Sequence, residues 1–487
     1  MTPRPSCWHT LRGSPRFFLL LTLLAVALRL VFYFKCPHVT GDSLIYGDIA
    51  KNWLQHGAFA MTEDGALVPT YIRLPGYPAF IALIWKIVGP EHYNAVMVVQ
   101  MFFDVGTCYV VAVLARLLLW DRAALIAFLL YALNPFAANY VATPLTETLA
   151  IFLSALALLF AVKGLQQLQN RNGWGAHWWI FCGLAIAAGI LLRPDAGILL
   201  AGIGGYLLLL LFRRPYRRRI VAAGILLATV ALAPLVPWTL RNWRVFHVFE
   251  PLAPRYANNP GEFVPAGFNR WIKTWLVDYV SVDDIFWHVP GDPLDIRKLP
   301  PRAFDSAEQR TVTEGLFSEY NATCDPFCRM TPELDAQFAA LAAERIRHSP
   351  LRYYLWLPLA RVAGMWLRPR TEALPLDSHW WRFRWDLKDA LIGVLLGAIN
   401  LAYVLAALIG ILRRRVAGAG LFVLWIVLRC ALLATLENPE PRYTLECFPV
   451  VCVFAAATLF RKASAETQQP ASLCNGLLNA DYCSNGG

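Results

Sequence analysis

A carboxylate and an arginine about thirty residues apart are the side chains of this chain best suited to chemistry. Asp42 lies in the segment Gly41-Asp42-Ser43-Leu44-Ile45-Tyr46, and Arg73 opens the segment Arg73-Leu74-Pro75-Gly76-Tyr77-Pro78. Apolar residues follow Asp42 at helical spacing, which predicts a helix lying along a membrane surface. These residues are Tyr46, Ile49, Ala50 and Trp53. A carboxylate held near lipid headgroups can act as a base toward a lipid-linked substrate.

The composition excludes a soluble globular protein and predicts an all-α polytopic membrane protein. Apolar residues make up 57% of the 487 residues, and 18 are Trp. Such a composition is typical of chains with several membrane spans. About ten spans are expected, in the runs 17–34, 93–119, 123–136, 149–162, 178–192, 196–212, 220–238, 387–412, 421–436 and 445–460.

The positions of the basic residues predict the orientation of these spans. Arg and Lys beside spans stay on the cytoplasmic side, and basic residues occur here at every second boundary, as in the cluster Arg213, Arg214, Arg217, Arg218 and Arg219. Both termini are therefore expected in the cytoplasm. These anchors account for most of the net charge of +11, so the charge gives no reason to expect nucleic-acid binding. The first run ends in the bulky residues Val31-Phe32-Tyr33-Phe34, which favours a retained anchor over a cleaved signal peptide.

This orientation divides the chain into five parts. A cytoplasmic N-terminus (1–16) precedes a membrane core (17–238) that includes a first external loop (35–92). An external loop or domain (239–386), the C-terminal spans (387–460) and a cytoplasmic tail (461–487) follow.

The external segment 239–386 is the only part outside the membrane that is long enough to fold by itself. A helix is predicted over Pro332–His348, with Thr331 as its cap. An amphipathic stripe beginning at Leu351 predicts a second helix, lying on the outer membrane surface. Cys324 and Cys328 lie in this segment and could close a small disulfide in an oxidising compartment.

Several residues, taken in order along the chain, resemble the GT-C glycosyltransferases of the family 39 and 83 type. This group contains protein O-mannosyltransferases, the lipid A aminoarabinose transferase and lipopolysaccharide-core transferases. The resemblance extends from about residue 15 to residue 460, and the external segment 239–386 is unmatched. It rests on Asp42 with Tyr46, Ala50, Leu54 and Gly57, then Arg73-Leu74-Pro75-Gly76-Tyr77-Pro78, Thr146-Glu147, Arg193-Pro194, Trp238 with Arg241-Asn242, and Arg442-Tyr443.

The resemblance implies a GT-C-like helical bundle with external surface helices and a mixed external insert. It also implies inverting transfer of a sugar from a polyprenyl-phosphate donor to a lipid, glycan or protein acceptor, on the extracytoplasmic face of a bacterial inner membrane. No cofactor is implied with certainty, and a divalent cation is left open. Asp42 matches the family's catalytic carboxylate, and Glu147 matches a second acid. Arg73, Arg241 and Arg442 are then candidates for binding the donor phosphate, and Tyr46, Tyr77, Arg193 and Tyr443 are further candidates for the substrate site.

Each of these residues also has a purely structural interpretation. Asp42 could cap the surface helix, and Glu147 could be the acid that favours the first turn of a helix beginning at Thr143 and Pro144. The arginines could extend to the membrane surface or pair with acids such as Glu437 and Glu440. Arg193-Pro194-Asp195 could be a salt-bridged turn.

A transporter or a flippase for lipid-linked sugars is the competing class of function. Such proteins are also polytopic, and they carry ionisable residues inside spans. Here Asp104 and Arg429 are such residues. They are isolated in the sequence, and no paired broken helices occur in corresponding halves, so the pattern favours an enzyme.

Overall fold

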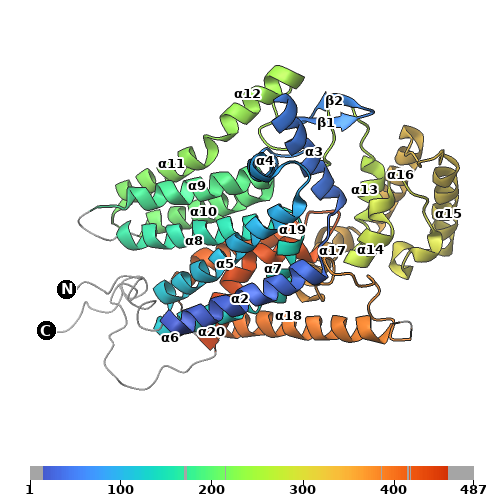
Figure 1. The fold of residues 1–487 in the computed structure, drawn as a ribbon. Coiled ribbons are helices and arrows are strands. Elements are labelled where there is room, and N and C mark those ends of the chain that lie inside the picture. Colours follow the sequence, from blue (N-terminus) through green and yellow to red (C-terminus); the bar gives the residue numbers. More distant parts are fainter. Residues whose placement is uncertain are drawn as a thin grey trace.

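The computed structural model describes residues 15–168, 173–213, 215–384, 386–413, 416 and 418–458. Within these residues the chain is mostly helical, and its long helices run side by side in a bundle (Figure 1). The expected cytoplasmic tail 461–487, almost all of the N-terminus 1–16, and Arg214 lie outside the described residues.

Each apolar run of the sequence is helical over most of its described residues, but the expected count of ten spans is not confirmed. Among the described residues, six helical segments are long and apolar enough to cross a membrane. They are α2 (Pro15–Lys35), α5 (Tyr93–Leu118), α8 (Glu147–Leu168), η2 (Pro194–Ala196) with α10 (Gly197–Arg213), α11 (Arg217–Leu232) with α12 (Leu235–Phe246), and α18 (Leu387–Arg413). The runs over α9 (Ala176–Leu192), α19 (Ala419–Leu433) and α20 (Phe448–Thr458) have only 17, 15 and 11 residues.

A seventh span is possible if a bent pair of helices counts as one. The axis turns by 46° between α6 (Asp121–Ala132) and the segment of α7 (Pro135–Asn139) and η1 (Tyr140–Ala142). Pro135 explains the break, because proline disfavours helical conformation in the residue before it. The Asn134 side chain then caps α7 by accepting hydrogen bonds from the backbone N–H groups of Phe136 and Ala137.

Asp104 and Arg29 form an ion pair buried inside the bundle. Arg29 Nε donates to Asp104 Oδ2 at 2.7 Å, and both side chains are fully buried. The Tyr131 hydroxyl donates to Asp104 Oδ1 at 2.8 Å, and the guanidinium also donates to the carbonyl of Ala132. Asp104 is therefore neutralised by a residue 75 positions away in the sequence, and the pair joins α2, α5 and α6.

Small residues allow the helices of the bundle to approach closely, as is usual in membranes. A Cβ atom at Gly410 on α18 would lie 2.0 Å from the carbonyl oxygen of Phe454 on α20. A Cβ atom at Gly164 on α8 would lie 2.7 Å from the Trp179 ring on α9. The first contact holds α18 against α20, and the second holds α8 against α9.

A two-stranded hairpin makes the expectation of an all-α fold wrong in one place. Strands β1 (Ala60–Glu63) and β2 (Ala66–Pro69) pair antiparallel, with Ala60 opposite Pro69. The turn residues Asp64 and Gly65 both have positive φ angles. Such a two-residue turn, with Asp-Gly at its centre, is typical of a tight hairpin.

The segment 239–386, which was expected on the external side, folds around its own aromatic core, which includes Trp271, Trp275, Phe317 and Phe338. In its described part it is helical rather than mixed, apart from an isolated bridge between Gly291 and Cys328. Its elements are α13 (Ala266–Ile272), α14 (Tyr279–Asp284), η3 (Phe286–His288), η4 (Ile296–Lys298), η5 (Pro301–Ala303), α15 (Ala307–Ala322), α16 (Pro332–His348), η6 (Arg352–Trp356) and α17 (Leu357–Leu367). We call this segment the insert.

Three predictions of local structure in the insert agree with the structure. Helix α16 begins at Pro332, and the Thr331 side chain caps it by accepting from the Leu334 N–H. The amphipathic stripe after Leu351 forms η6 and α17, with Leu351, Tyr354 and Leu359 exposed. Cys324 and Cys328 form a disulfide.

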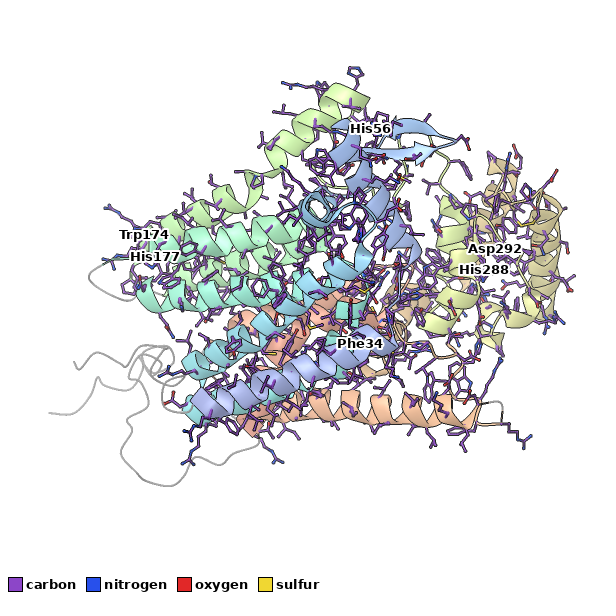
Figure 2. All side chains as sticks on the ribbon, viewed as in Figure 1. Phe34, His56, Trp174, His177, His288 and Asp292 are labelled. Atoms are coloured by element: carbon purple, nitrogen blue, oxygen red, sulfur yellow. A yellow bond between two sulfur atoms is a disulfide. The ribbon has the colours of Figure 1, made fainter. Side chains whose placement is uncertain are left out.

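The segments expected on the external side gather at one end of the bundle. Figure 1 shows α3 (Gly41–His56), the hairpin and the insert helices α13–α16 at this end. In Figure 2, His288 and Asp292 mark the insert, whereas Trp174 and His177, which precede or begin α9, lie at the opposite end. This arrangement places the first external loop beside the insert.

Candidate active site

Asp42 stands in the first turn of α3 but does not cap the helix. Thr40 is the cap: its hydroxyl accepts from the Ser43 N–H, and the Ser43 hydroxyl accepts from the Thr40 N–H. This reciprocal arrangement satisfies the end of the helix without Asp42. The structural interpretation of Asp42 as a helix cap is therefore wrong, and its carboxylate is available for other contacts.

Arg73 is positioned by the turn that precedes α4 (Gly76–Val88). This turn packs tightly against the end of α9, because a Cβ atom at Gly76 would lie 2.6 Å from the carbonyl oxygen of Leu191. Only glycine allows so close an approach of the two backbones. The turn therefore lies beside Arg193, which directly follows α9.

Arg73 and Asp42 form a partly exposed ion pair. Arg73 Nη2 donates to Asp42 Oδ1 at 2.6 Å, and 36% of the Asp42 side chain remains exposed. Burial raises the pKa of Asp42, but the positive charges of Arg73, Arg442 and Arg193 outweigh burial and hold the pKa below its ordinary value. Asp42 is therefore a carboxylate at neutral pH.

Glu147, Arg193 and Arg442 form a second, more buried group. Glu147 Oε1 accepts from Arg193 Nη1 at 3.0 Å and lies 3.5 Å from Arg442 Nη1, and the Glu147 side chain is 4% exposed. Helix α8 begins at Glu147 and not at Thr143 and Pro144 as predicted. Glu147 therefore lies at a helix N-terminus and in an arginine pair at once, so its structural and chemical interpretations both still apply.

Further acids keep these arginines charged. Arg442 lies 2.7 Å from Glu440, in the short segment before and within η7 (Pro441–Cys447). Arg193 pairs with Asp195 at 3.1 Å, as expected for a salt-bridged turn. Burial lowers the pKa of Arg442, but Glu440 and Glu147 raise it well above the ordinary value. Both arginines are thus cationic despite their burial.

Arg429 and Glu446 form a further ion pair next to this group. Arg429 Nη2 donates to Glu446 Oε1 at 2.8 Å and to Asp195 Oδ2 at 3.1 Å. Arg429, which is isolated in the sequence, is thus paired in the fold. Neither Asp104 nor Arg429 resembles a member of a proton relay, because each has an oppositely charged partner in a fixed contact.

The candidate tyrosines pack next to Arg73 and Arg193. The Tyr46 and Tyr77 rings meet edge to face with centroids 4.9 Å apart, and the Arg73 guanidinium lies over Tyr46. Burial raises the pKa of Tyr46 to about 12, so its hydroxyl stays protonated. The Tyr443 ring lies beneath both Arg193 and Arg442, and its hydroxyl donates to Glu440 at 2.6 Å.

Arg241 alone among the candidates makes its contacts elsewhere. Its amino groups donate to the backbone carbonyls of Thr70 and Phe59 at 2.7 and 2.8 Å. The guanidinium also lies against the rings of Phe59, Trp238 and Phe246. These contacts hold the hairpin on α12, and the structure does not bring Arg241 into the group around Asp42.

Other residues at the site were missed by the sequence analysis. Glu446 and Glu372 received no role, although an acid such as Glu446 next to an apolar run is unusual and is itself a reason to expect a functional site. Glu372 belongs to the insert and offers no comparable pattern. Among the described residues, no group of three or more His, Cys, Asp or Glu side chains is arranged to hold a metal ion.

Comparison with known proteins gives one family match. Residues 69–238 match the family described as dolichyl-phosphate-mannose-protein mannosyltransferase. The matched segment includes Arg73, Glu147 and Arg193, and it excludes Asp42 and Arg442. No curated protein matches the chain.

Solved structures share the fold at low sequence identity. The archaeal oligosaccharyltransferase AglB from Archaeoglobus fulgidus, in complex with an inhibitory peptide and a dolichol-phosphate, superposes with a TM-score of 0.53 at 13% identity, over 93% of this chain and 50% of AglB. Its apo form gives 0.50 at 13% identity, over 90% and 50%. ArnT from Cupriavidus metallidurans gives 0.39 at 13% identity, over 92% and 77%.

The chain thus spans about half the length of AglB. The family match covers the part of the membrane core that carries Arg73, Glu147 and Arg193, and the likeness to AglB covers almost the whole described fold. Residues 69–238 are thus similar to this mannosyltransferase family, and the fold of the chain is similar to that of AglB.

Proposed function

We propose that this chain is a membrane glycosyltransferase of the GT-C type that moves a sugar from a polyprenyl-phosphate donor to a hydroxyl group of a lipid, glycan or protein acceptor, with inversion at the anomeric carbon. The observation that carries the proposal is the contact between Asp42 and Arg73 beside the buried group of Glu147, Arg193 and Arg442. A candidate base thus lies next to candidate phosphate ligands. The donor class is supported by the description of the matched family and by the dolichol-phosphate in AglB.

Asp42 is the general base in this mechanism. The acceptor hydroxyl must lose its proton while it attacks the anomeric carbon, and a carboxylate is able to take that proton. Attack from the side opposite the phosphate inverts the configuration of the sugar. The partial exposure of Asp42 suits this role, because an acceptor can reach the carboxylate from outside the membrane.

Arg73, Arg193 and Arg442 are the proposed ligands of the donor phosphate. Negative charge grows on the phosphate as the sugar leaves, and guanidinium groups in a poorly hydrated site stabilise it strongly. The arginines are already charged and held in place by their acids. Glu147 contacts two of these arginines, Arg193 and Arg442, and we assign it the role of positioning them. In this scheme Glu147 also lies close to the sugar.

Donor binding activates Asp42 in this scheme. In the free protein Arg73 lowers the basicity of Asp42 through their direct contact. A donor phosphate that binds Arg73 competes for the guanidinium, neutralises its charge and releases the carboxylate. The pKa of Asp42 then rises, and the base becomes stronger only when a donor is present.

The proposed site lies on the extracytoplasmic face, with both termini in the cytoplasm, and the proposed location is a bacterial inner membrane. The argument is the positive-inside pattern together with the clustering of the first external loop and the insert at one end of the bundle (Figure 1).

A transfer assay tests the proposal. The purified chain in lipid nanodiscs is mixed with membrane extract and a panel of radiolabelled polyprenyl-phosphate sugars, which includes mannose, glucose, galactose and aminoarabinose. We expect label from one donor to move to a component of the extract, with the anomeric configuration opposite to that of the donor. Retained configuration, or no transfer from any donor of the panel, would contradict the proposal.

A further inference from the structure

The insert contributes a carboxylate to the site region that the reaction described above leaves without a role. Glu372 lies between α17 and α18, and its Oε1 accepts from the hydroxyl of Tyr140, which belongs to the membrane core, at 3.4 Å. Burial raises the pKa of Glu372, and the nearby charge of Glu440 acts in the same direction, against Arg370. Glu372 is thus partly buried, and its carboxyl group is harder to ionise than that of an exposed glutamate.

Arg370 fixes this carboxylate relative to Arg442. The Arg370 side chain is buried and donates to Asn400 Oδ1 at 3.1 Å and to Thr444 Oγ1 at 2.6 Å. It also donates to the carbonyl of Pro441, the residue before Arg442. The segment that carries Glu372 is therefore tied to the segment that carries Arg442, and both must move together.

The partner of Glu372, Tyr140, also interacts with groups of the proposed site. Tyr140 lies within electrostatic range of Glu372, Arg442 and Glu147. Tyr279, from the insert helix α14, has a pKa raised by burial and by the charges of Glu372 and Glu440. The groups that interact with Glu372 therefore include Tyr140, Tyr279 and Glu440, together with the arginines Arg368 and Arg370.

An independent observation indicates that a ligand binds in this region of the site. Glu147 Oε2 and Thr143 Oγ1 are buried and have no hydrogen-bond partner in the part of the chain that the structure describes. A buried polar atom without a partner destabilises the fold, because it has lost its hydrogen bonds to water. Both residues follow Tyr140, the hydrogen-bond partner of Glu372, within a few positions of the sequence.

We propose that Glu372 contacts substrate: it accepts a hydrogen bond from a sugar hydroxyl and sets which sugar the site takes. The inference rests on the proposed function and extends it to the insert. Carboxylates and tyrosine rings together suit a carbohydrate, because hydroxyl groups donate to the carboxylates while the C–H face of the sugar packs on a ring. The hydroxyl belongs either to the donor sugar or to a sugar of the acceptor.

The competing explanation is that Glu372 only balances the buried charge of Arg370. That role predicts a loss of stability in Glu372→Gln without any change in substrate dependence. A substrate contact predicts the opposite, because glutamine has nearly the same shape but binds a hydroxyl donor more weakly than a carboxylate does.

The test compares wild type, Glu372→Gln, Tyr140→Phe and the control Glu314→Gln, with rates normalised to folded protein. Glu314 is an exposed acid of the insert helix α15 and receives the same change of charge. We expect Glu372→Gln to raise the KM for one substrate about 10-fold or more, Tyr140→Phe to raise the same KM less, and Glu314→Gln to behave as wild type. A change in the KM of the donor identifies the donor sugar as the ligand, and a change in the KM of the acceptor identifies the acceptor.

Deoxy analogues of the affected substrate make the test specific. If Glu372 binds one hydroxyl, the analogue that lacks this hydroxyl should react equally well with wild type and Glu372→Gln, because the interaction is already lost. The inference would be overturned if the wild type is active and both Glu372→Gln and Tyr140→Phe have the same KM values as the wild type. If Glu372→Gln does not fold, Tyr140→Phe decides alone. A wild type without transfer activity contradicts the proposed function itself, which is a different outcome.

Discussion

Arg73 Nη2 donates to Asp42 Oδ1 at 2.6 Å, although 31 positions separate the two residues in the sequence. The contact joins α3 to the turn that precedes α4. Asp42 is free to form it because Thr40 caps the helix. Arg73 reaches it because Gly76 lets the turn pack on the end of α9. The predictions below follow from this pair and from the groups around it.

The first prediction concerns the dependence of the rate on donor concentration. Arg73→Ala should raise the KM for the donor strongly, whereas Arg73→Lys should retain part of the affinity, because lysine supplies charge without the bidentate fork. A donor titration normalised to folded protein measures both. Arg347→Ala, at an exposed position of the insert, is the control. If Arg73 is only an anchor, Arg73→Ala will lower the yield of folded protein and leave the donor dependence unchanged.

The second prediction concerns pH. A base works only when deprotonated, so the rate falls as the pH drops through its pKa. Arg73 and the other arginines hold the pKa of Asp42 below its ordinary value in the free protein, and the donor phosphate should relieve this effect. The acid limb of kcat, which reports the donor complex, should therefore lie at higher pH than the limb of kcat/KM for the donor. Coincident limbs would show that the donor leaves the Asp42–Arg73 pair intact.

The third prediction concerns stability and does not depend on activity. Arg29→Met leaves Asp104 as an unpaired buried carboxylate and should destabilise the fold by about 3 to 5 kcal/mol, whereas the double variant Arg29→Met/Asp104→Leu should regain much of this loss. The midpoint of thermal unfolding in detergent measures the difference. A single variant as stable as wild type would mean that the pair seen in the bundle contributes nothing.

The fourth prediction concerns the side of the membrane. In a background without native cysteines, Ala66→Cys in the hairpin should react with a membrane-impermeant maleimide applied from outside, and Arg218→Cys should not. Both positions are exposed. Labelling of Arg218→Cys alone would show that the chain has the opposite orientation, with the proposed site on the cytoplasmic face.

The sequence was informative wherever local rules decide the structure. The helix over Pro332–His348 has the predicted bounds and cap, since Thr331 and Pro332 specify a helix start through contacts within one turn. Each apolar run is helical over most of its described residues, because the pattern of apolar residues decides that locally. The number of spans is not a local property, since helices as short as α20 are held by neighbours such as Gly410 and not by their own length.

The site itself was predictable only in part. Asp42, Arg73, Glu147, Arg193 and Arg442 were singled out, and they lie together. Arg241 was also singled out, but the carbonyls of Phe59 and Thr70 bind it. Glu446 and Glu372 were missed because their partners are distant in the sequence: Ser154 lies 292 positions from Glu446, and Tyr140 lies 232 positions from Glu372. Only the folded chain shows such pairings.

The most direct test of the account is the transfer rate of Asp42→Asn at saturating donor and acceptor. Asparagine keeps the shape of the side chain and loses its basicity, and Thr40 still caps α3, so the protein should fold as wild type does. General-base assistance contributes about 10² to 10⁴ in rate, and the account predicts a loss of that size. Asp64→Asn, the same change in the exposed hairpin turn, should keep full activity. Transfer by folded Asp42→Asn at nearly the wild-type rate would contradict the assignment of Asp42 as the base.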